Sequence, residues 1–174
     1  YISGISAINS SRLSYENFDS LYQAEVKVFS QFGEDGIIDF ILYNLNIQKP
    51  TFVEIGVEDY SESNTRFLFQ RTSTKGLIID SRKDLKKIAF KILGNYSFKG
   101  QLSVVSDFID SDNIIDILNY TDNFNWFNAD IFSIDIDGID YWILEKVLPK
   151  LNSKLIIIEY NPLFGGLKEV SIPY

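Results

Sequence analysis

Two closely spaced carboxylates, Asp135 and Asp137, follow an apolar run in this sequence, and Glu159 follows the next such run. In an extended strand Asp135 and Asp137 point to the same side, because side chains alternate with a period of two. Carboxylates placed in this way can act as a general base or bind a divalent cation through oxygen. The plain alternative is that one of them caps the following helix, although Asp140 is better placed to do so.

Three further apolar runs also end in residues that could contact a ligand. These residues are Glu54 and Gly56, then Asp80, then Ser106 with Asp107. In open α/β sheets ligands bind beyond the carboxyl ends of the strands. Each of these residues alone could serve a turn. Polar residues follow all five apolar runs, and this repetition favours a binding site over five separate turns.

The composition narrows the chemistry that is available. The chain of 174 residues has no His and no Cys, which excludes Ser-His-Asp triads, imidazole bases, thiolate nucleophiles and His- or Cys-ligated zinc. Sixteen basic and 24 acidic residues give a formal net charge of −8, so we expect no nucleic-acid partner. No apolar stretch approaches the roughly 18 residues of a membrane span. The lack of Cys fits a reducing cytoplasm, where we expect the protein to act.

Five strands and four helices are predicted to alternate along one domain. The strands are expected at Thr51–Val57, Gly76–Asp80, Leu102–Val105, Ile131–Ile136 and Leu155–Tyr160, and the helices at Ser63–Arg71, Arg82–Leu93, Asn113–Tyr120 and Asp140–Leu148. Strands that are apolar on both faces are typical of a parallel sheet covered by helices on both sides. The sequence therefore predicts a doubly wound α/β fold.

The residues ahead of the first strand are predicted to be helical. Gly36–Leu45 carries an apolar stripe at helical spacing, with Asp35 as a candidate cap. A second helix is expected at Ser14–Ala24, with Ser14 as its cap. We divide the chain into a helical leader, 1–28, and a core domain, 29–174.

The loop after the first strand indicates the charge of the ligand. Gly56 is followed by no second glycine, whereas the pyrophosphate of a dinucleotide prefers a glycine-rich turn. The nearby acidic residues are Glu54, Glu58, Asp59 and Glu62. They would repel a pyrophosphate and attract a ligand with a sulfonium and an ammonium group, such as S-adenosylmethionine. Asp80 lies where an acidic residue hydrogen-bonds ribose hydroxyls.

At these residues the sequence resembles the class I S-adenosylmethionine-dependent methyltransferases, and more narrowly the FkbM-like branch associated with bacterial surface-carbohydrate clusters. The similar segments are Phe29–Ile37 (FSQFGEDGI), Phe52–Gly56 (FVEIG) with Glu62–Thr65 (ESNT), Ser133–Trp142 (SIDIDGIDYW) and Ile157–Asn161 (IIEYN). The resemblance implies a Rossmann-like, mainly parallel sheet. It also implies that the chain stops before the two C-terminal hairpin strands, which would leave an exposed sheet edge.

The resemblance also implies roles for the residues at the strand ends. The cofactor would be bound by Ser30, Gln31, Glu54, Gly56, Asn64, Thr65, Asp80, Ser106, Asp107 and Asp135. Catalysis would fall to Asp135, Asp137 and Glu159. The acceptor would be a small or carbohydrate-linked molecule, namely a sugar, nucleotide-linked or phosphate- or phosphoramidate-type precursor of capsular polysaccharide, and the transfer would be to oxygen.

Several alternatives remain open at this point. Asp135 and Asp137, with Glu159 or Asn161 from the next strand, could bind Mg²⁺ or Mn²⁺, although a metal is not the favoured interpretation. An NAD(P)-dependent oxidoreductase is a second hypothesis, which the acidic loop disfavours. A non-catalytic ligand-binding or interaction domain is a third. An oligomer is compatible with the sequence.

Overall fold

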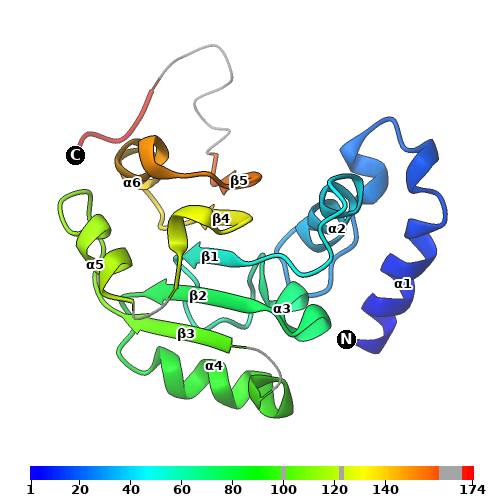
Figure 1. Ribbon diagram of the computed structural model, residues 1–174, viewed down its shortest axis with the longest axis horizontal. Coiled ribbons are helices and arrows are strands. Elements are labelled where there is room, and N and C mark those ends of the chain that lie inside the picture. The colour runs from blue at the N-terminus through cyan, green and yellow to red at the C-terminus, as the bar shows by residue number, and fades with distance from the viewer. Residues whose placement is uncertain (99–100, 122–123, 161–169) are drawn as a thin grey trace.

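A single five-stranded sheet forms the centre of the molecule, in a computed structural model that describes residues 1–98, 101–121, 124–160 and 170–174. The strand order is β3-β2-β1-β4-β5, and every neighbouring pair is parallel (Figure 1). The strands are β1 (Phe52–Ile55), β2 (Lys75–Asp80), β3 (Gln101–Ser106), β4 (Ile131–Ile134) and β5 (Leu155–Ile158). The predicted Rossmann-like α/β fold is confirmed, and the order reverses between β1 and β4.

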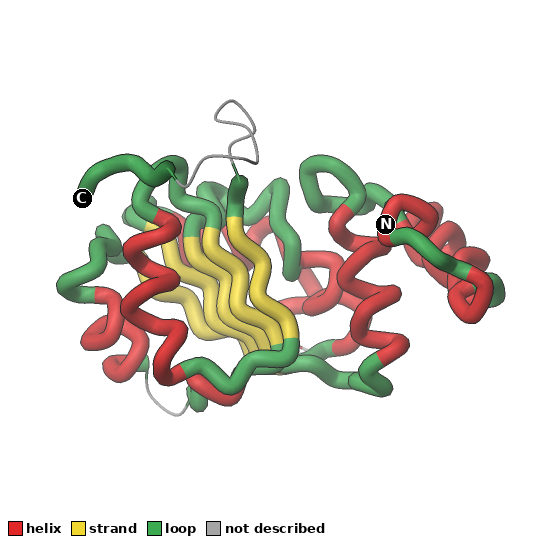
Figure 2. Tube along the Cα trace, turned by 90° about the horizontal axis from the view of Figure 1, so that it is seen from above, coloured by secondary structure: helices red, strands yellow, loops and turns green. Residues whose placement is uncertain are grey.

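Helices cover both faces of this sheet (Figure 2). On one face α2 (Glu34–Asn44), α3 (Arg66–Thr72) and α4 (Leu85–Leu93) bury residues such as Phe52 and Ile78. On the other face α5 (Ile114–Tyr120) and α6 (Asp140–Val147) bury alternate strand residues such as Val53 and Leu77. Because both sets of strand side chains are buried, the central strands are mostly apolar, and buried polar residues such as Glu54 of β1 and Ser133 of β4 are hydrogen-bonded.

The predicted strands match the observed ones, but β2 begins one residue earlier than predicted, β3 extends one residue further at each end, and the other three strands end earlier. The structure ends β1 two residues before Val57, β4 two residues before Ile136 and β5 two residues before Tyr160. Asp135 and Glu159 therefore lie just beyond their strands. The two helices α3 and α4 begin three residues later than predicted, because the residues just ahead of α3 form a bend and those just ahead of α4 form a turn. Short 3-10 helices occupy Gly94–Phe98, Trp126–Asn128 and Leu148–Lys150.

The N-terminal leader contains an α-helix that the sequence analysis did not predict. This helix, α1 (Ile2–Arg12), lies outside α2 and far from the sheet (Figure 1). The helix expected over Ser14–Ala24 is instead two 3-10 helices, Tyr15–Asn17 and Leu21–Ala24, and Ser14 makes no capping hydrogen bond with its side chain.

A buried carboxylate, Asp39 of α2, connects the leader to the core domain. Arg12 donates two hydrogen bonds to it, at 2.8 and 2.7 Å, and the Tyr15 hydroxyl donates a third at 2.9 Å. Arg71 of α3 also donates to Asp39. Because Asp39 is only 4% exposed, these donors compensate a charge that would otherwise be costly to bury.

The prediction that Asp35 caps α2 is wrong. Gly33 occupies the N-cap position, and the Asp35 carboxylate accepts hydrogen bonds from the preceding loop instead. The sequence pattern was that of a cap, but the chain doubles back over the start of the helix. Val26 and Gly36 form a backbone hydrogen bond at 3.1 Å that fixes this return.

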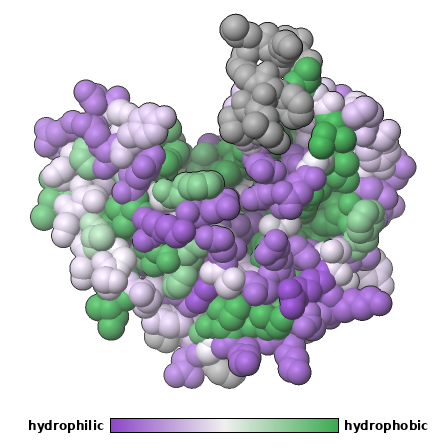
Figure 3. All heavy atoms as spheres, turned by 180° about the vertical axis from the view of Figure 1, so that it is seen from behind, coloured by the Kyte–Doolittle hydropathy of each residue, from purple (hydrophilic) through white to green (hydrophobic). Residues whose placement is uncertain are grey.

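The molecular surface is mixed in polarity. On the face seen in Figure 3, hydrophobic residues form small patches among hydrophilic ones. Among the described residues, no helix is both long enough and apolar enough to cross a membrane.

Candidate functional site

Backbone hydrogen bonds extend the sheet by one step beyond the strands and so align the candidate residues. The amide of Asp135 donates to Ile55 O at 3.0 Å, and the amide of Asp107 donates to Asp80 O at 2.9 Å. The amide of Glu159 donates in the same way, to Ile134 O at 3.2 Å. The parallel register therefore places these polar residues at one edge of the sheet, at the point where the strand order reverses.

The larger of two clefts at this edge has a volume of about 500 Å³. Its lining combines carboxylates with apolar side chains: Gly56, Glu58, Asp80, Ser81, Asp107, Phe108, Ile109, Asp135, Ile136, Asp137, Gly138, Ile139 and Ile172. Asp80 accepts hydrogen bonds from the amide of Glu58 at 2.8 Å and from the amide of Arg82 at 2.9 Å. Each bond uses a different oxygen, so each oxygen keeps capacity for a ligand hydroxyl.

The smaller cleft, of about 210 Å³, adjoins the first because Gly56, Glu58, Asp135 and Asp137 line both. We call it the acidic compartment; its lining residues are Gln31, Glu54, Gly56, Val57, Glu58, Glu62, Ser63, Asn64, Asp135, Asp137 and Glu159. Every charged residue among the described linings of the two clefts is acidic. The site therefore favours cationic ligands and disfavours phosphates next to its carboxylates.

Three carboxylates converge in the acidic compartment. Oxygens of Asp135, Asp137 and Glu159 all lie within 4.8 Å of one another. Partial burial, and after it the charge of Glu159, raise the pKa of Asp135 to about 6. Burial and the charge of Asp137 also raise the pKa of Glu159. A carboxylate with a raised pKa is suited to accept a proton near neutral pH.

These three residues also fit a divalent cation, since Mg²⁺ and Mn²⁺ prefer oxygen ligands. The third carboxylate is Glu159, one of the two residues that the sequence offered as a further ligand, the other being Asn161. Asn161 lies outside the described residues.

Asp135 and Asp137 converge for a different reason from the one predicted. They do not lie in an extended strand, because β4 ends at Ile134 and Asp137 adopts a left-handed conformation with φ of 55°. Asp140 at the start of α6 holds this turn by accepting hydrogen bonds from the amides of Ile136 and Gly138, at 2.8 and 2.9 Å. The expectation that Asp140 caps α6 is wrong, because Ile139 is the N-cap and no side chain among the described residues makes a capping hydrogen bond there; Asp140 holds the preceding turn instead.

Position 56 has to be a glycine because the backbone that follows β4 passes very close to it. Gly56 has a φ of 80°, and a Cβ atom added there would lie 1.6 Å from the carbonyl oxygen of Asp135. The backbone that approaches Gly56 thus belongs to the neighbouring segment of the chain. Gly56 still contributes its backbone to the walls of both clefts.

Three of the predicted cofactor residues are buried and used within the protein. Glu54 accepts hydrogen bonds from the Ser63 hydroxyl at 2.7 Å, from the amide of Asn64 at 2.8 Å, and from both the amide and the hydroxyl of Thr65. Burial raises the pKa of Glu54, and these hydrogen bonds counteract that rise. All three hold loops of the chain, Ser30 through its hydrogen bond to Asp35; Glu54 also lines the acidic compartment, whereas Ser30 and Thr65 are not among the described lining residues of either cleft.

The remaining predicted residues lie at the clefts, with one exception. Gln31 and Asn64 line the acidic compartment, and Asn64 Nδ2 donates to the Ser133 hydroxyl at 3.2 Å. Asp80 and Asp107 line the larger cleft. Ser106 is exposed at the end of β3 but is not among the described lining residues of either cleft.

The sequence analysis missed the apolar wall of the larger cleft. This wall contains Phe108 and Ile109 after β3, Ile139 before α6, and Ile172 near the C-terminal end. Phe108 and Ile109 directly follow the polar residues at the end of β3, so their positions in the sequence could have placed them at the site. Ile172 reaches the cleft through tertiary structure, held by a hydrogen bond from Trp142 Nε1 to its carbonyl oxygen at 2.7 Å.

Comparison of the chain with protein-family models, with curated proteins and with solved structures finds no match. The function is therefore inferred from the geometry and charge of the site.

Proposed function

We propose that this chain is an S-adenosylmethionine-dependent O-methyltransferase that acts on a precursor of bacterial surface (capsular) polysaccharide. The observation that supports this most is the charge of the two clefts, whose described charged linings are all carboxylates. S-Adenosylmethionine carries a sulfonium and an ammonium group, which such a lining attracts, whereas a dinucleotide carries a pyrophosphate, which it repels. The alternative of an NAD(P)-dependent oxidoreductase is disfavoured for this reason.

The two clefts suit the two halves of that cofactor. The larger one offers an apolar wall with Phe108 and Ile109 for an adenine ring, and Asp80 for the ribose hydroxyls. The acidic compartment offers Glu58 and Glu62 for the ammonium group, together with the carboxamides of Gln31 and Asn64. When bound, the cofactor supplies an electrophilic methyl group.

Asp135 is the residue best suited to accept the proton that a hydroxyl acceptor loses during transfer. It lines both clefts, and its pKa of about 6 leaves it deprotonated at neutral pH but basic enough to accept a proton. Asp137 and Glu159 stabilise the protonated form of Asp135, because one fewer negative charge then stands in the compartment.

The negative charge of the acidic compartment also limits which acceptor groups can bind there. A phosphate or phosphoramidate group next to Asp135 would meet three carboxylates at once. Among the acceptor types considered, a sugar hydroxyl is therefore the best fit, with the phosphates of a nucleotide-linked sugar lying outside the compartment.

Calorimetric titration with S-adenosylhomocysteine and, separately, with NADH tests this proposal. We expect saturable binding of S-adenosylhomocysteine and none of NADH. Binding of NADH alone would favour the oxidoreductase. Binding of neither would favour a non-catalytic domain, and either result would overturn the proposal.

A further inference from the structure

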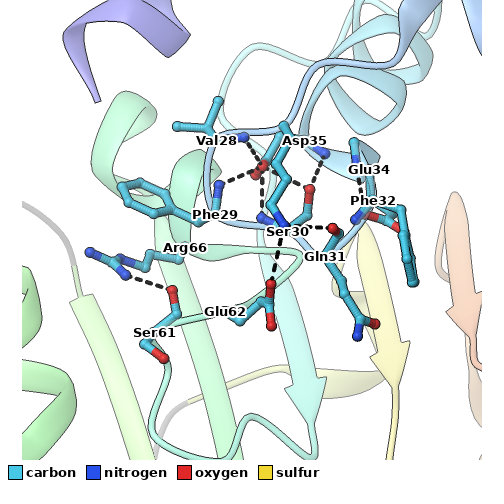
Figure 4. Close-up of polar contacts among 12 residues, drawn as sticks. Val28, Phe29, Ser30, Gln31, Phe32, Glu34, Asp35, Ser61, Glu62 and Arg66 are labelled. Carbon is cyan, nitrogen blue, oxygen red and sulfur yellow. Dashed lines mark hydrogen bonds and ion pairs between the residues drawn. The ribbon is translucent and has the colours of Figure 1, made fainter.

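The loop that carries Gln31 into the acidic compartment is held by a buried carboxylate with no role in the clefts. One oxygen of Asp35 accepts hydrogen bonds from three consecutive amides, those of Val28, Phe29 and Ser30, at 2.8, 2.7 and 2.8 Å. The same oxygen accepts a fourth, from the Ser30 hydroxyl, at 2.8 Å (Figure 4). Asp35 is 2% exposed, so this carboxylate is used to shape the backbone just before Gln31.

Two further contacts fix the backbone at and after Gln31. The Glu34 carboxylate accepts hydrogen bonds from the amides of Phe32 and Gly33, at 2.8 and 2.9 Å. Lys27 Nζ donates to the carbonyl oxygen of Gln31 at 2.7 Å. Gln31 is thus held on both sides, and Figure 4 shows its side chain extending away from the Asp35 cluster.

The Gln31 side chain differs from the other polar linings of the acidic compartment. Within the part of the chain that the structure describes, the Ser63 hydroxyl donates to Glu54, and Asn64 Nδ2 donates to Ser133. The Gln31 carboxamide makes no such bond to a described residue. It therefore keeps its N–H donors for a ligand, in a compartment whose other exposed groups are carboxylates.

An amino-acid ligand needs such a donor there. Its ammonium group is attracted by Glu58 and by Glu62, whose charge is partly offset by an exposed ion pair with Lys27 at 3.4 Å, but its carboxylate is repelled by the same two residues. A fixed neutral N–H donor offsets that repulsion without adding a charge.

We infer that Gln31 binds the carboxylate of the cofactor's amino-acid moiety, and that Asp35, together with Glu34, is a positioning residue that acts through Gln31. This inference rests on the proposed function and adds the group that recognises one end of the cofactor. It assigns Asp35 no contact with the ligand.

The test is a double-mutant cycle on S-adenosylhomocysteine affinity, measured by calorimetry. We expect Gln31→Ala to weaken binding about tenfold, the effect of losing one charge-assisted hydrogen bond. Asp35→Asn, which keeps the size of the side chain, should weaken binding by a similar factor. In the Gln31→Ala background Asp35→Asn should add nothing, because its effect passes through Gln31.

A second ligand separates positioning from general damage. 5′-Methylthioadenosine has the adenosine and thioether portions but no amino-acid end, so its affinity should be unchanged in every variant that folds. Gln48→Ala and Asp112→Asn are the matched controls, since both residues are exposed and line neither cleft. Neither control should change either affinity.

Amide hydrogen exchange gives a readout that needs no ligand. Exchange at Val28, Phe29 and Ser30 should be faster in Asp35→Asn and unchanged in Gln31→Ala. If Asp35→Asn does not fold, the less buried Glu34→Gln takes its place, with faster exchange expected at Phe32 and Gly33 and the same dependence on Gln31.

Several results would overturn the inference. One is an unchanged S-adenosylhomocysteine affinity in Gln31→Ala. Another is a loss in the double variant equal to the product of the two single losses. A third is a loss of 5′-methylthioadenosine affinity in the variants as large as their loss of S-adenosylhomocysteine affinity. Absence of S-adenosylhomocysteine binding in the unaltered protein would overturn the proposed function itself, and this inference with it.

Discussion

Replacing Asp135 by asparagine should make the protein more stable at neutral pH, although the same change should impair catalysis. Asp135 shares the compartment with Asp137 and Glu159, and partial burial raises its pKa from an ordinary 3.8 to about 6. A raised carboxyl pKa means that the folded state binds the proton more tightly than the unfolded chain does. The ionised form is therefore unfavourable to folding, and Asp135→Asn removes that charge while keeping the shape of the side chain.

The size and pH window of the effect follow from the two pKa values. A rise from 3.8 to about 6 corresponds to about 3 kcal/mol if all of it acted on folding. The side chain is exposed to solvent in the cleft, so screening reduces this to about 1 kcal/mol. The destabilisation is complete above pH 6, declines as pH falls through the window between the two values, and disappears below 3.8.

Thermal denaturation at pH 8 and at pH 4.5 checks this expectation. At pH 8 the midpoint of Asp135→Asn should lie about 2–4 °C above that of the unaltered protein. At pH 4.5 most of that difference should be gone. Asp112→Asn, an exposed carboxylate outside both clefts, should show no comparable gain. A variant that is less stable at pH 8, or equally stabilised at both pH values, would refute the reasoning.

Three further predictions concern ligand binding, the metal alternative and the loop after β1. Asp80→Ala should weaken S-adenosylhomocysteine binding by about 2–3 kcal/mol, and Asp80→Asn by less, as measured by calorimetry. If both variants bind as tightly as the unaltered protein, Asp80 does not belong to the site. If the three converging carboxylates hold a divalent ion, Mn²⁺ should raise the thermal midpoint of the unaltered protein but not of Asp137→Asn. An equal response of both proteins would place the ion elsewhere. Glu54→Gln should lower the free energy of unfolding by about 2 kcal/mol in chemical denaturation, because an amide cannot accept every hydrogen bond that the buried carboxylate accepts. A smaller loss than in the exposed control Glu145→Gln would contradict the structural role given to Glu54.

Much of the fold could be predicted from the sequence because burial on both faces leaves a strong pattern. The run Leu77–Ile79 is apolar at every position, and its side chains are buried alternately on the two faces of the sheet. α1 could not be predicted in this way, since only Gly4 and Ile8 in it are buried. Two buried positions in 11 residues give too weak a periodicity to distinguish a helix from a loop.

The candidate site could be located from the sequence but not resolved into roles. Residue types and strand ends were enough to bring Asp80, Asp135 and Glu159 to one edge. Residue type and position were not enough to distinguish these exposed carboxylates from Glu54 and Asp35, which are also carboxylates and also lie close to the end of a strand or loop.

Burial and hydrogen-bond partners make that separation. Asp35 and Glu54 each accept four hydrogen bonds from short loop segments, with Asp35 holding the loop ahead of Gln31 and Glu54 the loop ahead of α3. Their oxygens are needed as acceptors because several amides in each tight loop have no partner in a helix or strand. Asp135 and Asp137 accept no hydrogen bond from another described residue and so remain available for a ligand, whereas Asp80 lines the larger cleft and also accepts two backbone amides. Burial and the number of backbone amides within reach therefore distinguish an acidic residue that only holds a loop, such as Asp35, from one that keeps its oxygens free for a ligand, such as Asp135.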